Sequence, residues 1–169
     1  MTDIVSAPLG KVQEILAATY AACDTRVEEV EQDLEAIKST QFPSAQFLTG
    51  KITRWQHMKG ELLKRKSKGK RIEFAARRDF ETKYWDALKN GPLGRQQANG
   101  FAFEERKAAA MSRFVVEHTK WELMIEANNA VELAIDTIDA HMWGVKNTQQ
   151  VVKMEHDDAK YASTKDYID

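Results

Sequence analysis

Apolar positions recur at helical spacing through most of the chain, and no segment shows the alternation of a β-strand. In the N-terminal third, apolar or small residues follow one another at steps of three and four: Leu16, Tyr20, Cys23, Val27, Val30, Leu34 and Ile37. This spacing predicts a helix that begins near Pro8 and ends before Phe42-Pro43. Proline is favoured in a first helical turn and ends a helix that precedes it.

This N-terminal seam alternates like a heptad repeat over about three repeats, and acidic residues flank it. Two interpretations stay open. The seam packs on the rest of its own chain, or it joins copies of the chain in a coiled coil. In the second case the contact residues are Val27, Val30, Leu34 and Ile37.

A second helix is predicted from near Ser44 to Lys89, with a candidate kink at Gly69. The turn residues Asn90-Gly91-Pro92 end it. A long helix follows from about Phe103 to Met142, with an apolar stripe along one side, and we expect Gly144 to break it. A short amphipathic helix and a frayed polar tail complete the chain.

These elements predict an all-α protein with long helices in a bundle or hairpin, coiled-coil-like packing and assembly into an oligomer. The length of 169 residues suits one domain. The long stripe, from Phe114 to Ile138, is a second candidate surface for the oligomer. The expected parts are an acidic helix in 1–43, a basic helix in 44–90, a loop in 91–102, a long helix in 103–143 and a short helix with a tail in 144–169.

The net charge of −1 conceals an uneven distribution along the chain. Residues 51–95 hold 14 basic and 5 acidic side chains, whereas the segments on either side are each net acidic. Such asymmetry indicates a polyanionic partner for the middle segment, or pairing of acidic with basic parts in an assembly.

The basic helix places large aromatic side chains among its cations. At about 100° per residue, Phe74 and Trp85 lie opposite the presumed core face. Cations track phosphates and aromatic rings stack on unpaired bases, so the pattern favours single-stranded nucleic acid. Packing of both rings on another helix stays open. The candidate binding residues are Lys64, Arg65, Lys66, Lys68, Lys70, Arg71, Phe74, Arg77, Arg78, Trp85 and Lys89.

No catalytic, metal-binding or cofactor-binding motif is recognisable, so we expect neither an enzyme nor a bound cofactor. His118 and Cys23 lie on apolar stripes, which predicts interior side chains. A lone cysteine cannot form an internal disulfide, which is typical of the reducing cytosol. We find neither a secretory signal nor an apolar run long enough to cross a membrane, and therefore expect a cytoplasmic protein.

The segment from about Trp55 to Asp157 resembles the phage recombination mediators of the UvsY type. A tryptophan-led helix precedes the basic stretch KGKRIEFAARRDFETKYWDAL, the loop NGPLGRQQANG and the long helix HTKWELMIEANNAVELAIDTIDA. The terminal piece WGVKNTQQVVKME completes the pattern. The acidic first helix is largely additional to that family.

The resemblance implies a ring-like oligomer that binds single-stranded DNA in the host cytoplasm. Such a protein helps a RecA-like recombinase displace single-strand binding protein, without hydrolysis. The implied DNA contacts are Lys64 to Lys68, Lys70, Arg71, Arg77 and Arg78. The alternative function is a helical adaptor or inhibitor, in phage assembly or against host defence, whose basic helix docks on an acidic protein.

Overall fold

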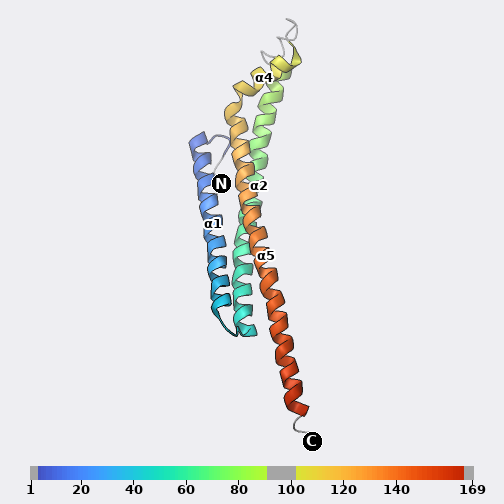
Figure 1. Ribbon diagram of the computed structural model, residues 1–169. Coiled ribbons are helices and arrows are strands. Elements are labelled where there is room, and N and C mark those ends of the chain that lie inside the picture. Colours follow the sequence, from blue (N-terminus) through green and yellow to red (C-terminus); the bar gives the residue numbers. More distant parts are fainter. Residues whose placement is uncertain (1–3, 91–101, 166–169) are drawn as a thin grey trace. The chain divides into compact units, whose positions relative to one another are not determined.

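The computed structural model describes residues 4–90 and 102–165, and almost all of them are helical (Figure 1). The described residues form four helices in this order: α1 (Leu9–Ser39), α2 (Ala45–Lys89), α4 (Phe103–Arg113) and α5 (Val115–Lys165). The described residues contain no strand, and the helices pack on one another. The prediction of an all-α helical bundle is confirmed.

The first two helices lie close to their predicted positions. The Ser44 hydroxyl accepts a hydrogen bond from the Phe47 amide at 3.1 Å and so caps the first turn of α2. Gly69 does not interrupt α2, which is helical from Ala45 to Lys89. Most of the predicted loop, residues 91–101, lies outside the described residues.

The break in the C-terminal half lies at Phe114 and not at Gly144, so the predicted boundary at residue 143 is wrong. Phe114 leaves helical geometry with φ −112° and ψ 26°. Its ring is half-buried against a small cluster formed by Ala87, Leu88 and Ala110. Two β-branched residues, Val115 and Val116, follow and lower the local helix propensity.

Gly144 stays helical because the residues after it are packed. Glycine costs about 1 kcal/mol in a helix interior, which contacts farther along the helix can offset. Val145 is buried, and the Gln149 amide donates a hydrogen bond to the Ala45 carbonyl at 3.2 Å. The helix therefore continues to Lys165, through most of the predicted polar tail.

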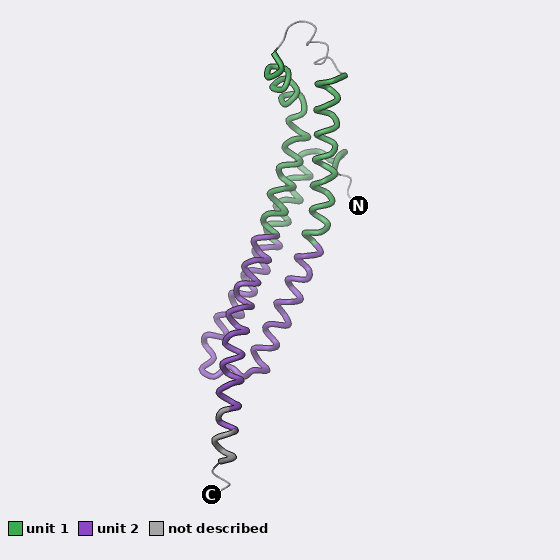
Figure 2. Tube along the Cα trace, turned by 90° about the vertical axis from the view of Figure 1, so that its right-hand side faces the viewer, with its two compact units in different colours: residues 1–21, 65–131 green, residues 22–64, 132–169 purple. Residues whose placement is uncertain are grey.

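The chain divides into two compact units, each built from two separate stretches (Figure 2). Unit 1 comprises residues 1–21 and 65–131, and unit 2 comprises residues 22–64 and 132–169. The single-domain organisation stays a prediction. In unit 1, Val12 of α1, Ala76 of α2 and Met124 of α5 meet in one apolar cluster.

Unit 2 has its own buried apolar residues on three helices. They include Val30 on α1, Trp55 on α2 and Ile138 on α5, each 0% exposed. Cys23 is also buried, as its place on the apolar seam predicts. An ion pair of 2.6 Å between Lys59 and Asp139 links α2 to α5 in this unit.

Burial changes the interpretation of both predicted oligomer surfaces. Val30 is fully buried inside its own chain, and Val27, Leu34 and Ile37 are half-buried. The long stripe from Phe114 to Ile138 is likewise interior or half-buried throughout. Both stripes therefore belong mainly to the intramolecular core, because a side chain that is already covered has no surface left for a second copy.

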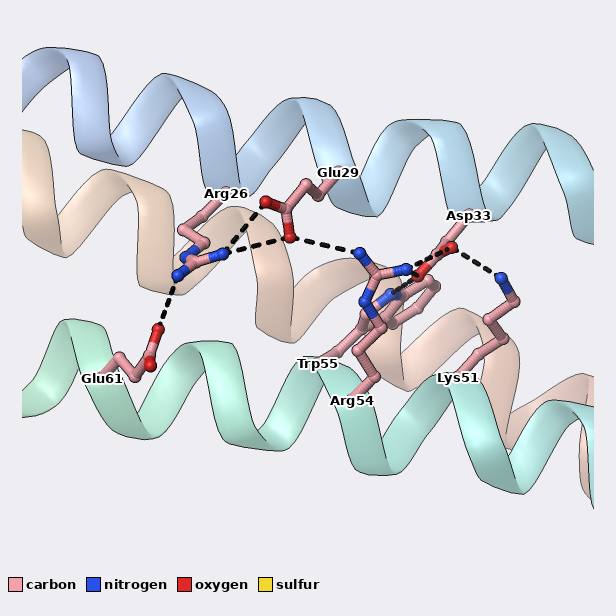
Figure 3. Close-up of polar contacts among 7 residues, drawn as sticks. All are labelled: Arg26, Glu29, Asp33, Lys51, Arg54, Trp55 and Glu61. Carbon is pink, nitrogen blue, oxygen red and sulfur yellow. Dashed lines mark hydrogen bonds and ion pairs between the residues drawn. The ribbon is translucent and has the colours of Figure 1, made fainter.

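Asp33 on α1 is the centre of a polar network that joins α1 to α2 in unit 2 (Figure 3). Its carboxylate is 5% exposed; it accepts hydrogen bonds from Lys51 at 2.6 Å and from the buried Trp55 indole at 2.9 Å. Arg54 adds a third bond at 3.1 Å. A buried carboxylate without such partners would strongly destabilise the fold.

The network extends outward along both helices (Figure 3). Arg54 also contacts Glu29 at 3.3 Å, and Glu29 pairs with Arg26 at 3.0 Å. Burial raises the pKa of Asp33, but the bonds from Lys51 and Trp55 and the nearby positive charges outweigh that effect and hold the pKa below its usual range. Ionised Asp33 therefore stabilises the folded state.

We expect Asp33→Asn to lower the free energy of unfolding at pH 7 by about 1–3 kcal/mol, because bonds to a buried charge are lost. The pKa of Asp33 is lower in the folded than in the unfolded chain, so its stabilisation is present above the unfolded pKa of about 4 and is lost as pH falls through the folded value. Thermal melts of wild type and Asp33→Asn should therefore converge in acid.

The matched control is Glu31→Gln, which neutralises an exposed carboxylate on the same helix. Its melting temperature should follow the wild-type profile from pH 7 down to pH 2. Stability profiles of wild type and Asp33→Asn that stay parallel over this range would show that Asp33 is not the titrating group.

Candidate nucleic-acid interface

Several predicted binding cations on α2 are already paired with carboxylates of their own chain. Lys70 lies 2.9 Å from Glu73, and Arg77 lies 2.8 Å from Glu81. The half-buried Lys66 also has an interaction within the chain. These three side chains are less available to an external phosphate than the sequence alone indicates.

Lys83, a cation of the basic segment, stabilises the folded chain. It donates to Asp79 on its own helix and to Glu117 on α5, both at 2.9 Å. These bonds raise the pKa of Lys83. Burial raises the pKa of Glu117, but the bond from Lys83, a backbone hydrogen bond and the positive charges of Lys83 and Lys120 together outweigh burial and lower that pKa. Lys83 thus ties α2 to α5 within unit 1.

The other predicted cations are exposed and have no carboxylate of the described chain within ion-pair distance. Within unit 1 they are Arg65, Lys68, Arg71, Arg78 and Lys89. Lys64 is equally exposed but belongs to unit 2. At about 100° per residue, all of the unit 1 set except Arg65 share one face of α2. A cation without a carboxylate partner in its own chain is available to pair with an anionic ligand.

Phe74 lies on this face between Arg71 and Arg78, one helical turn from each. Its side chain is 66% exposed, and no other aromatic ring of the described chain contacts it. Packing on another helix of the chain therefore does not account for Phe74. An exposed ring between two unpaired guanidinium groups can stack on a flat, anionic ligand.

Trp85 lies in a different environment, although it was predicted to share the face with Phe74. It is 47% exposed, stands edge-on to Tyr84 at 5.2 Å and lines a groove of about 510 Å³ between α2 and α4. Two carboxylates, Glu81 and Glu104, line the same groove. Each is paired with a cation, Glu81 with Arg77 at 2.8 Å and Glu104 with Lys107 at 2.9 Å. The groove therefore has no unpaired cation to offer a phosphate, and the candidate site is centred on residues 65–78.

An aromatic cluster behind the basic face holds α2 against α5 in unit 1. The Phe80 ring lies 5.9 Å from the Trp121 ring and 4.9 Å from the His118 ring. The Arg77 guanidinium lies 5.6 Å above the Trp121 ring. His118 is half-buried, as its place on the apolar stripe predicts. The cluster gives Arg77 a second structural role, in addition to its pair with Glu81.

Gly69 of α2 lies directly against the side chain of Asn128 on α5 in unit 1. A Cβ atom at this position would lie 2.0 Å from Oδ1 of Asn128. Asn128 is 2% exposed, and its amide donates to Glu73 at 2.6 Å. The glycine in the basic run therefore makes room for a buried, hydrogen-bonded amide. The helix continues without interruption through this position.

We expect Gly69→Ala to destabilise the protein by about 1–2 kcal/mol, because the new methyl group displaces Asn128 from its bond to Glu73. In an Asn128→Ala background the same substitution should stabilise the protein by up to about 1 kcal/mol, since alanine is the better helix former and the clash is gone. Denaturant unfolding of the wild type, the two single variants and the double variant measures whether the effect of Gly69→Ala on the free energy of unfolding changes sign.

Gly60→Ala is the matched control, because Gly60 lies in the same helix with no atom near its absent Cβ. It should stabilise the protein in both backgrounds by up to about 1 kcal/mol. If Gly69→Ala has the same effect with and without Asn128, the close approach of these two residues does not constrain the helix pair.

Comparisons with protein-family models, curated proteins and solved structures find no match to this chain. Over residues 4–90 and 102–165, no helix is both long and apolar enough to cross a bilayer. The same residues bring together no group of three or more histidine, cysteine or acidic side chains able to hold a metal ion. The basic face of α2 is thus the strongest candidate site in the described chain.

Proposed function

We propose that this protein binds single-stranded DNA along the face of α2 centred on Phe74. The observation that carries the proposal is the exposed Phe74 ring between Arg71 and Arg78, neither of which has an acidic partner in the described chain. The two arginines are about 10 Å apart along the helix. They can contact phosphates on either side of a base that stacks on the ring.

Single strands suit this face better than duplexes. Stacking on Phe74 requires a base whose flat side is accessible, whereas contacts to phosphates alone accept either form. None of the arginine and lysine side chains of this face is held in a fixed hydrogen-bonded geometry, so they offer charge without a pattern that reads base edges. We therefore propose binding with little sequence preference.

The resemblance to UvsY-type mediators extends the proposal to a biological role. The protein would load a RecA-like recombinase onto DNA that single-strand binding protein covers, and it would act as a homo-oligomer without catalysis of its own. This role rests on the pattern of helices and charges. The DNA-binding proposal rests on the geometry of α2 and stands independently of it.

One observation favours a second function, docking on a protein. The groove beside Trp85 offers Tyr84 and Met111 to an apolar side chain, next to the basic face. A helical adaptor or inhibitor that binds an acidic protein would use both surfaces together. Substitutions at Phe74 and Trp85 separate the two functions, because DNA binding depends on Phe74 and protein docking on Trp85.

We expect Arg71→Ala and Arg78→Ala each to weaken binding to an oligo-dT strand and to flatten its salt dependence. Each lost phosphate contact should reduce the slope of log affinity against log salt by roughly 0.7. Fluorescence anisotropy at four salt concentrations measures the slope. The control is Lys38→Ala, an exposed cation of α1 that pairs with Glu35, and its slope should equal that of wild type. Unchanged slopes for both arginine variants would rule out phosphate contacts on this face.

We expect Phe74→Ala to weaken single-strand binding by about 1–3 kcal/mol and to leave the salt slope unchanged, because stacking releases no counterions. Phe74→Leu should lose nearly as much, since it keeps the apolar volume but not the ring, whereas Phe74→Trp should retain binding. The melting temperature should stay at the wild-type value in all three, because the side chain is exposed. Equal affinity of the wild type for single and double strands of one length would refute the stacking contact.

A further inference from the structure

The basic face of α2 is a strongly charged helix face that the chain itself leaves without carboxylate partners. In unit 1 its exposed cations at residues 68–78 are Lys68, Arg71 and Arg78. None of the three has an acidic side chain of the described chain within ion-pair distance. The Phe74 ring, 66% exposed, stands between the two arginines. A partner for this face must therefore offer carboxylates on either side of a place for an aromatic ring.

An exposed face of α1 in unit 2 carries a row of carboxylates. Four of them recur at steps of four, three and four and so share one side of the helix: Asp24, Glu28, Glu31 and Glu35. Glu35 pairs with Lys38. Among the described residues, no cation lies within ion-pair distance of the other three. This acidic face is the counterpart of the basic face in charge, and it too is unpaired.

A groove of about 620 Å³ runs beside the acidic face, between α1 and α5 of unit 2. The half-buried Leu34 gives the groove an apolar part. The rest of its lining is polar: Glu28, Glu31, Gln32, Glu35, Lys38 and His141. A ring such as that of Phe74 can contact Leu34 while the cations beside the ring meet the carboxylates.

The two faces also agree in length. At 1.5 Å per residue, the basic face extends about 15 Å along α2 from Lys68 to Arg78. The acidic face extends about 17 Å along α1 from Asp24 to Glu35. Helices that lie side by side can therefore bring most of the opposite charges together at the same time, which favours association of complementary surfaces.

We propose that the basic face of α2, residues 68–78, docks on the acidic face of α1, residues 24–35, of a second copy of this chain. The occupant is a second copy because every chain carries both halves of the contact, each exposed and each without an ion-pair partner of its own. The contact joins two different surfaces, so each end of an assembled pair keeps one unoccupied face to which a further copy can add.

This contact regulates DNA binding, and in that respect it rests on the proposed function. It uses the same arginines and the same ring as the proposed DNA site. A strand bound to the basic face excludes the acidic face of the neighbouring copy, because both ligands are anionic and need the same cations. Assembly and DNA therefore compete, and the α1 carboxylates displace anions that bind more weakly than the neighbouring copy does.

The first test is the mass of the full chain in solution at low and at high salt, by light scattering at micromolar concentration. We expect a mass above 19.3 kDa in about 0.01 M salt and a fall to 19.3 kDa in about 1 M salt, because the screening length drops from about 30 Å to about 3 Å. A wild type that stays at 19.3 kDa in low salt would overturn the proposal, and so would an assembly that salt does not dissociate.

The second test exchanges the charges of the two faces. One variant combines Glu28→Lys with Glu31→Lys, and the other combines Arg71→Glu with Arg78→Glu. Each variant alone should have a dissociation constant for self-association about 100-fold or more above that of the wild type, because like charges then face each other. An equal mixture of the two should assemble again, since each reversed face meets its opposite on the other variant. A mixture that stays at the mass of one chain would refute the contact.

The matched control combines Glu14→Lys with Glu155→Lys, two exposed carboxylates outside the acidic face. It changes the net charge as much as the Glu28 and Glu31 pair does, and it should assemble like the wild type. Loss of assembly in this control would show that association follows net charge and not the assigned face. Circular dichroism melts of all variants, together with recovery of assembly in the mixture, exclude unfolding as the cause of a lower mass.

A short oligo-dT strand added to the wild-type assembly at low salt separates this proposal from the DNA-binding one. We expect the mass to fall to that of one chain with its strand. If the charge exchange restores assembly but the wild type binds no strand, the DNA-binding proposal fails and the contact between copies stands. If the strand binds without lowering the mass of the assembly, the two ligands do not share a face and the contact is misplaced.

Discussion

The contact of Asn128 with the backbone of Gly69 determines which side of α2 faces α5 in unit 1. The buried amide is bonded to Glu73, so α2 must present a residue without a side chain at this point, and Gly69 is the one glycine in the unit 1 part of the helix. With Gly69 directed inward, the residues on the far side of the helix, Phe74 and Arg78 among them, are directed to solvent. The candidate interface is therefore a consequence of a close helix contact on the opposite side.

The charges of α2 are divided between folding and binding. In unit 2, Lys51, Arg54 and Lys59 pair with acids on α1 and α5, and in unit 1 Lys83 bridges α2 to α5. A buried or half-buried ion pair must be complete, because one partner alone would leave a charge with little solvation. Cations on the outer side do not balance a buried charge. They can bind the phosphates of a nucleic acid and so release its counterions.

The sequence by itself determined the helices and the position of the basic segment. Helical periodicity, the start near Ser44 and the turn at Asn90 are local features, and such features place the bounds of α1 and α2. It also placed Phe74 among arginines, because helical geometry converts spacing directly into a shared face.

Only the tertiary structure decided which side chains remain available. Contacts between distant segments carried α5 past Gly144, tied Lys83 to Glu117 and enclosed Val30 in the core. They also placed Trp85 beside α4 and left Trp143 uncovered. The physical reason is that burial and ion pairing depend on which helix lies opposite, and no spacing within a single helix records its neighbour.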